Sequence, residues 1–367
     1  MSGSQNRIKY LDGLRGIAIM LVVFSHYWGS TWISNFPVSN VIASLRIVRQ
    51  GWIGVDLFFL ISGFVIFKTI ERCSNSQQFL WRRWLRLFPA MAIVSIITVL
   101  FNWTIQPIKY FYESPWYDIM PGLSFISPSF FHAILDIEIK SLHHAFATLY
   151  IEVGFYVIFS LLYFYFGWKK ATVTLVLLGL ITVFGEQILM LSSLPKEFQR
   201  MIEPAEWLGM QYYIWFSSGI LFAKASQEEC KSFFMIAILT GIIASLIVSP
   251  GGSVISWQDS QSMAAIVLLF AISQLWLRLQ NLLQNPILIF FGMISYPLYL
   301  IHETVGLGLI VLTNSFLPDI PRVLLPIPTL VTIIYVAFCL TKYVEPPIKL
   351  LLERIITRRP VAVGHIV

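Results

Sequence analysis

Ten stretches of predominantly apolar residues recur along this chain, each close to the ~20 residues that a helix needs to cross the hydrocarbon core of a bilayer. They cover residues 14–33, 52–70, 87–105, 142–167, 171–191, 207–223, 232–249, 261–277, 287–312 and 323–343. The stretches are too evenly apolar for the alternation of a transmembrane β-barrel strand. Helices satisfy their own backbone hydrogen bonds in lipid. The sequence therefore predicts an all-α integral membrane protein with about ten transmembrane helices.

The composition supports this interpretation and argues against a soluble protein. Of the 367 residues, 57% are hydrophobic and only 12% are charged, whereas about 25% of a soluble domain is charged. We expect a single transmembrane domain over residues 1–367, with its core at 10–350. The three cysteines are widely separated and show no metal-binding, redox or disulfide pattern. The net charge of +6 includes no basic block interleaved with aromatic residues, so we expect no nucleic-acid partner.

The distribution of basic residues predicts the orientation in the membrane. If ten spans start from a cytoplasmic N-terminus, 18 of the 25 Lys and Arg residues fall on the cytoplasmic side and 7 outside. Because cytoplasmic loops carry the excess of basic residues, both termini are predicted to be cytoplasmic. No small-residue cleavage site follows Trp28, so we expect a retained first span rather than a signal peptide. The protein is thus predicted to be a multi-pass protein of the cytoplasmic (inner) membrane.

The first apolar stretch carries two ionisable groups, Arg15 near its start and His26 in its middle. Eleven residues at ~100° each make three turns plus roughly 20°, so both would lie on one helix face about 16 Å apart. Asp12, three residues before Arg15, is placed to orient its guanidinium group. Ionisable groups inside spans are costly and indicate function. Arg15 also fits a cation that reaches the membrane interface, and His26 a structural hydrogen bond between helices.

The fourth and ninth stretches add polar groups near the depth of His26. Glu152 lies about ten residues into the fourth stretch, with Tyr156 one turn further on the same face. A carboxylate there is placed to hold the second nitrogen of the His26 imidazole and raise its basicity. In the ninth stretch, Pro297 predicts a kink. One face of that stretch carries Ser295, Tyr299 and His302, of which His302 fits a structural role as well as a catalytic one.

A basic cluster opens the third stretch, with Arg82, Arg83 and Arg86. Guanidinium groups bind phosphate through paired hydrogen bonds, so the cluster fits an anion site for a phosphate-rich cytoplasmic ligand. It also fits simple anchoring of the span to the cytoplasmic face. In the second stretch, Asp56 is buried near the outer end, and the Ser62-Gly63 pair predicts close packing against another helix.

The longest segment between apolar stretches, residues 106–141, is rich in aromatic residues and proline. Loops of this length are often functional. An aromatic surface suits sugar rings, and it equally fits a belt of aromatic residues at the membrane interface. The exposed candidates are Trp116, Tyr117, Phe130 and Phe131. Three histidines match no metal-binding spacing, so we expect them to be solvated and expect no metal site: His132, His143 and His144.

Six blocks, taken together and in this order, resemble one family. They read YLDGLRGIAIMLVVFSHYW, GWIGVDLFFLISGFVIF, FLWRRWLRLFPAM, TLYIEVGFYVIF, FGMISYPLYLIHE and VEPPIKL, and they extend from Tyr10 to Leu350. This chain resembles the membrane-bound acyltransferase-3 family, whose members modify bacterial surface polysaccharides and related glycans. Many members carry a further C-terminal esterase-like domain. We expect it to be missing here, because the sequence ends soon after the tenth stretch.

The resemblance extends to individual residues. The family pattern of an Arg, ten residues and a His matches Arg15 and His26, and its Arg-Arg-x-x-Arg pattern matches the basic cluster of the third stretch. The family's Trp-Ser-Leu-x-x-Glu block appears here as ATLYIEVGFY, so Glu152 matches while the Trp and the Ser do not. The assignment of Glu152 is accordingly the weaker one.

The resemblance implies an enzyme that moves an acyl group, most often acetyl, from cytoplasmic acyl-CoA to a hydroxyl of an extracytoplasmic or lipid-linked glycan. In this interpretation His26 is the general base, Glu152 assists it, and the arginines, Arg15 included, bind acyl-CoA. Acyl-CoA is then a donor substrate, and we expect no permanently bound cofactor. Direct transfer and transfer through an acyl-enzyme both fit.

Two other functions fit the same residues. Ionisable groups within the spans and a broken ninth span are also typical of a proton-coupled secondary transporter of a small solute. Transporter halves usually show internal symmetry, and we find no internal repeat in this sequence. A catalytically inactive membrane partner of a glycan-assembly complex is the third hypothesis.

Overall fold

The computed structural model describes residues 8–29, 40–104, 115–191, 203–248 and 255–357. Within these ranges the chain forms helices, turns and loops with no β-strand, which confirms the all-α prediction. The end of the first apolar stretch, residues 30–33, lies outside the described residues, as does the first part of the loop 106–141, up to residue 114.

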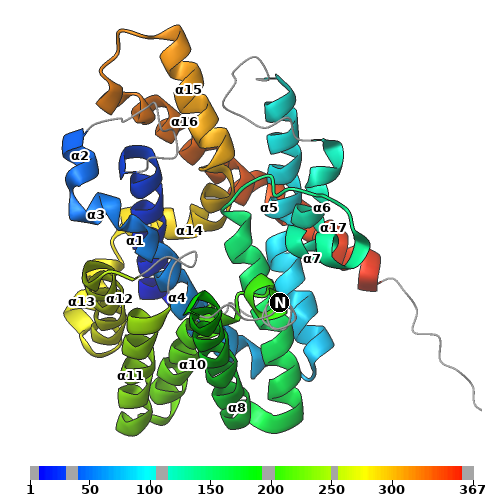
Figure 1. Ribbon diagram of the computed structural model, residues 1–367, viewed down its shortest axis with the longest axis vertical. Helices are drawn as coiled ribbons and strands as arrows, with labels where there is room; N and C mark the ends of the chain where they lie inside the picture. The colour runs from blue at the N-terminus through cyan, green and yellow to red at the C-terminus, as the bar shows by residue number, and fades with distance from the viewer. Residues whose placement is uncertain (1–7, 30–39, 105–114, 192–202, 249–254, 358–367) are drawn as a thin grey trace, which may run out of the picture.

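Within the described residues, each predicted apolar stretch is mostly helical (Figure 1). The helices concerned are α1 (Lys9–Phe24), α4 (Gly54–Ile70), α5 (Ser76–Thr104), α8 (Phe146–Leu191), α10 (Tyr213–Glu228), α11 (Lys231–Ile247), α12 (Trp257–Leu275), α14 (Pro286–Ile301), α15 (Thr304–Phe316) and α16 (Pro326–Cys339). The shorter helices are α2 (Asn40–Ser44), α3 (Arg46–Arg49), α6 (Met120–Ser124), α7 (Pro128–Leu135) and α13 (Leu277–Leu283). A final helix, α17 (Glu345–Thr357), follows α16 through the π-helical turn Leu340–Val344.

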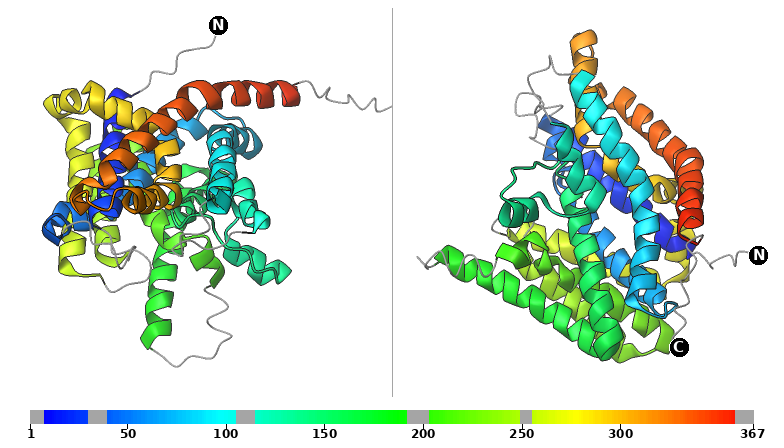
Figure 2. Two further views of the ribbon diagram at one scale, coloured as in Figure 1. Left: turned by 90° about the horizontal axis from the view of Figure 1, so that it is seen from above. Right: turned by 90° about the vertical axis from the view of Figure 1, so that its right-hand side faces the viewer.

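Several of these helices are long and apolar enough to cross a membrane. Among the described residues, four helical segments meet this criterion on their own, and six do if each of two bent helix pairs counts as one span. The count of ten and the cytoplasmic termini remain predictions. Figure 2 shows that the start of α1 and the whole of α17 lie at one end of the molecule, whereas α7 and the far end of α8 lie toward the other.

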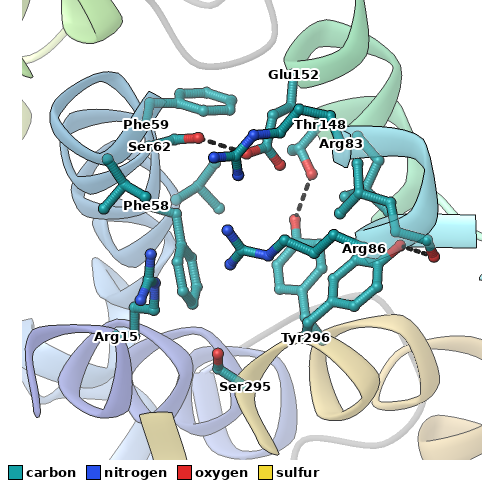
Figure 3. Close-up of a pocket in the computed structure, with 15 residues that line it drawn as sticks. Arg15, Phe58, Phe59, Ser62, Arg83, Arg86, Thr148, Glu152, Ser295 and Tyr296 are labelled. Atoms are coloured by element: carbon teal, nitrogen blue, oxygen red, sulfur yellow. Dashed lines mark hydrogen bonds between the residues drawn. The ribbon is translucent and has the colours of Figure 1, made fainter. Parts of the chain in front are cut away.

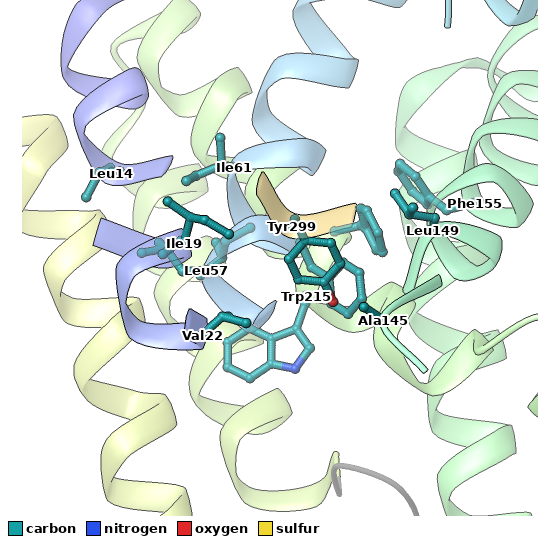
Figure 4. Packing of buried hydrophobic residues seen from close by; sticks show 14 of the residues in the cluster. Leu14, Ile19, Val22, Leu57, Ile61, Ala145, Leu149, Phe155, Trp215 and Tyr299 are labelled. Atoms are coloured by element: carbon teal, nitrogen blue, oxygen red, sulfur yellow. The ribbon is translucent and has the colours of Figure 1, made fainter. Parts of the chain in front are cut away.

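The centre of the bundle is α1, which packs between α4 and α14, while α10 covers the other side of α4. Leu14 and Ile19 of α1 and Leu57 of α4 are fully buried. Figure 4 shows Val22 of α1 beside Leu57, with Trp215 of α10 close by. A helix that is apolar on most of its circumference is stable only when other protein or lipid surrounds it. The first apolar stretch is therefore an interior helix of the bundle.

Glycines allow close approaches between these helices, as Gly16 and Gly63 show. A Cβ atom at Gly16 would overlap the backbone carbonyl of Leu288 in α14, and one at Gly63 would overlap that of Phe216 in α10. Small residues let helix backbones come this close, and packing of this kind holds helices together in lipid. The close packing predicted at Gly63 is confirmed.

The fourth and fifth apolar stretches form one long helix with a sharp break. α8 is non-helical at a single residue, Gly167, with φ 79° and ψ 165°. A positive φ is readily adopted by glycine, which has no Cβ atom. The expected short loop between the two stretches is thus reduced to one glycine.

The ninth stretch bends sharply after Pro297. The helix α14 continues through Pro297, and the break comes at His302 and Glu303, where α15 turns away by 75°. The side chain of Glu303 accepts a hydrogen bond from the backbone N–H of Ala145, at 2.6 Å. The hydroxyl of Tyr27 donates to the carbonyl of His302, at 2.9 Å. Neighbouring segments therefore hold both residues of the break, and the kink at Pro297 itself stays a prediction.

We predict that Gly16→Ala destabilises the protein by about 1–3 kcal/mol, the usual cost of forcing a methyl group into a packed interior. The obstacle is backbone of α14, which moves only if the whole helix moves. Thermal unfolding of the detergent-solubilised protein measures the effect. Gly154→Ala is the matched control, because its new methyl group meets side-chain atoms of Tyr213 and Leu208 at 3.2 and 3.3 Å. Equal losses in both variants would contradict this account of α1 packing.

Candidate active site

Two connected cavities follow α4 through the bundle. The inner one has an empty volume of about 710 Å³, including its open mouth. Its lining comprises Arg15, Val55, Phe58, Phe59, Ser62, Val65, Arg83, Arg86, Leu87, Thr148, Leu149, Glu152, Ser295, Tyr296 and Tyr299 (Figure 3). The site thus draws on α1, α4, α5, α8 and α14, which are far apart in the sequence.

The outer cavity lies at the end of the molecule where α1 begins. Its empty volume is about 1440 Å³, and its lining comprises Ile8, Leu11, Asp12, Arg15, Phe64, Val65, Lys68, Thr69, Arg72 and Arg86. Arg15, Val65 and Arg86 line both cavities. Between Val55 and Thr69, the lining residues of α4 extend over roughly 21 Å at 1.5 Å per residue. The two cavities therefore adjoin along α4, with basic residues around the outer one.

Arg15 is held in place by an ion pair within α1. Its Nη1 donates to Oδ1 of Asp12 at 3.1 Å, and Asp12 is buried. An acidic residue one turn earlier restricts a long side chain to one direction, and the charges attract across the turn. The predicted orienting role of Asp12 is confirmed. In Figure 3 the guanidinium groups of Arg15, Arg83 and Arg86 point into the same inner space.

The arginines of the third stretch separate into two groups. Arg83 is only 5% exposed, its Nη2 donates to the hydroxyl of Thr69 at 2.5 Å, and its guanidinium lies 5.6 Å from the ring centre of Tyr156. Arg86 lines both cavities. Arg82 lines neither, and its Nη1 donates to the backbone carbonyl of Arg72 at 3.3 Å. Of the predicted cluster, the structure brings Arg83 and Arg86 to the site.

Glu152 supplies negative charge within the inner cavity. Its Oε1 accepts short hydrogen bonds from the hydroxyls of Ser62 in α4 and Tyr156 one turn further along α8. Tyr156 was expected on the same face, whereas nothing in the sequence singled out Ser62 as a partner. Because three guanidinium groups and one carboxylate line this cavity, the inner space favours anions.

Two hydroxyl groups that line the inner cavity contact each other. The hydroxyls of Thr148 and Tyr299 are 2.9 Å apart. Ser295, on the same face of α14, donates to the carbonyl of Gly292 at 2.9 Å. Of the three residues predicted on this face, Ser295 and Tyr299 line the cavity and His302 does not. Thr148 is a lining residue that the sequence did not indicate.

His26 lies beyond this contact, in the π-helical turn Ser25–Gly29 that follows α1. Its Nδ1 is 3.0 Å from Nε2 of His302, and the ring of His302 in turn lies 5.3 Å from that of Tyr299. His26 lines neither of the two cavities. The expected contact was between His26 and Glu152. The structure instead pairs His26 with His302, because the hydrogen bonds of Glu152 go to hydroxyl groups of α4 and α8.

Two other predicted groups lie outside the cavities. Asp56 is buried in the first turn of α4, as expected, and lines neither cavity. His143 is only 1% exposed, so the prediction of a solvated loop histidine is wrong for it. Its Nε2 is 2.6 Å from the hydroxyl of Thr98, and its Nδ1 accepts from the N–H of Thr304 at 3.2 Å. The remaining two histidines of that group, His132 and His144, are exposed as expected.

The side chains that most often bind metal ions are those of His, Cys, Asp and Glu. Within the described ranges, no three of them lie together in a way that would hold a metal ion. The site is thus a path lined by arginine, hydroxyl and aromatic groups, with an imidazole pair at its inner end.

Comparison with known proteins assigns the chain to a family. Residues 8–342 match the acyltransferase domain of the acyltransferase-3 family. The chain belongs to this family. The family resemblance inferred from the six sequence blocks is confirmed, and with the apolar helices it makes this acyltransferase-3 protein a multi-pass membrane protein.

Relatives match shorter parts of this acyltransferase-3 protein. It is 27% identical over 139 residues to the peptidoglycan O-acetyltransferase OatA of Listeria monocytogenes, an alignment that covers 33% of this chain and 20% of the relative. It is 33% identical over 96 residues to an O-acetyl transferase of Shigella phage Sf6, covering 26% and 27%. The putative membrane-bound transacylase BcsY of Komagataeibacter xylinus is 31% identical over 102 residues, covering 27% and 22%. The chain thus spans between a fifth and about a quarter of these relatives, and no solved structure matches it.

The different positions of Arg86 and Arg82 lead to a prediction about anion binding. Arg86→Ala should weaken the binding of inorganic pyrophosphate by roughly tenfold or more, because a guanidinium–phosphate contact contributes about 1.5–3 kcal/mol. Arg82→Ala is the matched control and should change the affinity less than about twofold. Isothermal titration of the purified protein measures both. If Arg82→Ala weakens binding as much as Arg86→Ala, the anion site is not the one that the cavities define.

Proposed function

We propose that this protein is an O-acyltransferase that moves an acyl group, acetyl in the simplest case, from cytoplasmic acyl-CoA to a hydroxyl of an extracytoplasmic or lipid-linked glycan. The observation that carries the proposal is the basic two-part cavity, which begins beside the start of α1 and reaches Tyr299, whose ring neighbours that of His302. Family membership and the O-acetyltransferase relatives support the same reaction class.

The outer cavity suits the phosphate groups of CoA. Four basic residues line it, namely Lys68, Arg72, Arg15 and Arg86. The inner cavity continues between Phe58, Phe59 and the hydroxyl groups, a surface that suits an extended chain ending in a thioester. A donor bound in this direction would carry its acyl group toward Tyr299.

His26 supplies the general base in this proposal. A glycan hydroxyl is a weak nucleophile, so its proton passes to the imidazole as its oxygen attacks the thioester carbon. The carbon–sulfur bond then breaks, the ester forms, and His26 returns the proton to the sulfur of CoA. The Thr148–Tyr299 contact lies between the inner cavity and the imidazole pair. The thioester therefore reaches His26 when these two hydroxyl-bearing side chains separate.

The acceptor approaches from the other end of the molecule in this proposal. There, Trp116 is 63% exposed, and Tyr117 and Phe130 are also exposed. The carboxylate of Asp118 accepts from the backbone N–H of Lys140 at 3.0 Å, which ties this aromatic segment to the chain leading into α8. Aromatic faces stack on the apolar faces of sugar rings. The protein would thus lie in the cytoplasmic membrane, with donor below and acceptor above.

We predict that His26→Ala lowers acyl transfer by about 10²–10⁴-fold, the usual contribution of a positioned base. Binding of acyl-CoA should change little, because His26 lies beyond the cavities that would hold the donor. Single-turnover assays with purified protein, and a separate donor-binding titration, measure the two effects. Retention of more than about a tenth of the wild-type rate would contradict the role of His26 as general base.

The direction of transfer is tested in proteoliposomes of known orientation. Acyl-CoA supplied to the face where α1 begins should be consumed only when an acceptor glycan is present on the opposite face. Equal transfer to a membrane-impermeant acceptor on the donor face would overturn the cross-membrane arrangement. Uptake of a labelled solute without any acylated product would instead identify a transporter.

A further inference from the structure

The two imidazoles near the end of the inner cavity have defined hydrogen-bonding roles. Nδ1 of His302 lies 2.6 Å from the backbone carbonyl of Tyr299. A carbonyl oxygen only accepts hydrogen bonds, so Nδ1 of His302 must carry a proton. The other nitrogen of His302, Nε2, lies 3.0 Å from Nδ1 of His26. One of these two nitrogens therefore donates and the other accepts.

Burial decides which nitrogen is the donor. His302 is 0% exposed, and a charged group is costly to bury. The neutral form of His302 has a single ring proton, already placed on Nδ1, so its Nε2 carries a lone pair. Nδ1 of His26 is then the donor, and the neutral His26 ring keeps its lone pair on Nε2. The chain of contacts from Tyr299 through His302 thus selects one tautomer of His26.

We infer that His302 is a positioning residue that fixes the tautomer and orientation of His26, so that Nε2 of His26 is the basic nitrogen. This inference rests on the proposed function, in which His26 is the general base. When Nε2 takes the proton of the acceptor hydroxyl, the new imidazolium keeps its Nδ1 proton in a hydrogen bond to the lone pair of His302. The proton on Nε2 then passes to the departing sulfur of CoA, and His302 stays neutral throughout.

The surrounding backbone holds His302 in the required place. Its N–H donates to the carbonyl of Leu298 at 3.0 Å, as the last residue of a helix does. Its carbonyl lies at the break before α15, and it accepts from the hydroxyl of Tyr27 at 2.9 Å. Tyr27 follows His26 directly in the chain. Side chain and backbone of His302 are therefore both joined to the same π-helical turn, which limits how far the two rings can separate.

The tautomer is measured directly by ¹⁵N NMR of the full-length protein in lipid nanodiscs with ring-labelled histidine. The chain has six histidines, and the signals of His26 are assigned by their loss in His26→Gln. We expect a protonated, pyrrole-type Nδ1 and an unprotonated, pyridine-type Nε2 at neutral pH. A pyrrole-type Nε2 in the wild-type protein overturns the inference, whatever reaction the protein catalyses.

Kinetics of two His302 variants test the consequence for transfer. His302→Leu has no acceptor for the His26 proton, so its kcat should fall about 10–100-fold while the KM for acetyl-CoA stays within about twofold. His302→Gln offers a side-chain carbonyl as a replacement acceptor and should recover at least part of that loss. Trp28→Phe is the control for disturbance of the same turn. It removes the hydrogen bond of the indole to the carbonyl of Val323 and part of a buried ring, but no contact of His26 with His302, so the His26 signals should keep the same tautomer.

The outcomes separate this inference from the proposed function. If His302→Leu keeps more than a third of the wild-type kcat with the His26 tautomer unchanged, His302 has no positioning role while acyl transfer stands. If the wild-type protein forms no acylated product, the proposed function fails, and the NMR measurement still decides the tautomer. Should His302→Leu fail to fold, the wild-type spectrum and the His302→Gln variant carry the test.

Discussion

Three consecutive residues at the end of the first helix connect the beginning of the chain to its last third. His26 meets the ring of His302, Tyr27 donates to the carbonyl of the same residue, and Trp28 donates to the carbonyl of Val323. Lipid gives apolar helix surfaces little reason to prefer each other, so close backbone packing and polar contacts decide which helices meet. These contacts join the end of α1 to the break after α14, and other helices of the bundle pack around the two.

A third segment, residues 143–145, contacts the break between α14 and α15. The carboxylate of Glu303 accepts from the N–H of Ala145, and the N–H of Thr304 donates to the ring of His143. Unpaired backbone groups are very costly in a bilayer, so a broken helix persists only where neighbours satisfy it. The break therefore fixes the start of α8, and with it the position of Glu152 on the inner cavity.

The sequence predicted contacts within a helix better than contacts between helices. Asp12 with Arg15, and Glu152 with Tyr156, follow from a spacing of three or four residues, which the helix geometry determines. The choice of Ser62 as the partner of Glu152 depends on how α4 and α8 are rotated about their axes, and that rotation is set by packing. Packing between helices also explains two residues that the sequence did not place. The burial of His143 depends on its contacts with α5 and α15. Arg82 points away from the cavities that Arg83 and Arg86 line.

Arg15 and His26 lie on the same helix but contact different parts of the molecule. Eleven residues advance a regular α-helix by about 16 Å. Arg15 lines the basic cavities, whereas His26 lies three turns further along the helix and lines neither. From Ser25 the chain forms the wider π-helical turn, with hydrogen bonds five residues apart, and the ring of His26 meets that of His302. One helix thus presents a cation to an anion path and an imidazole to a buried partner, because its length separates the two residues.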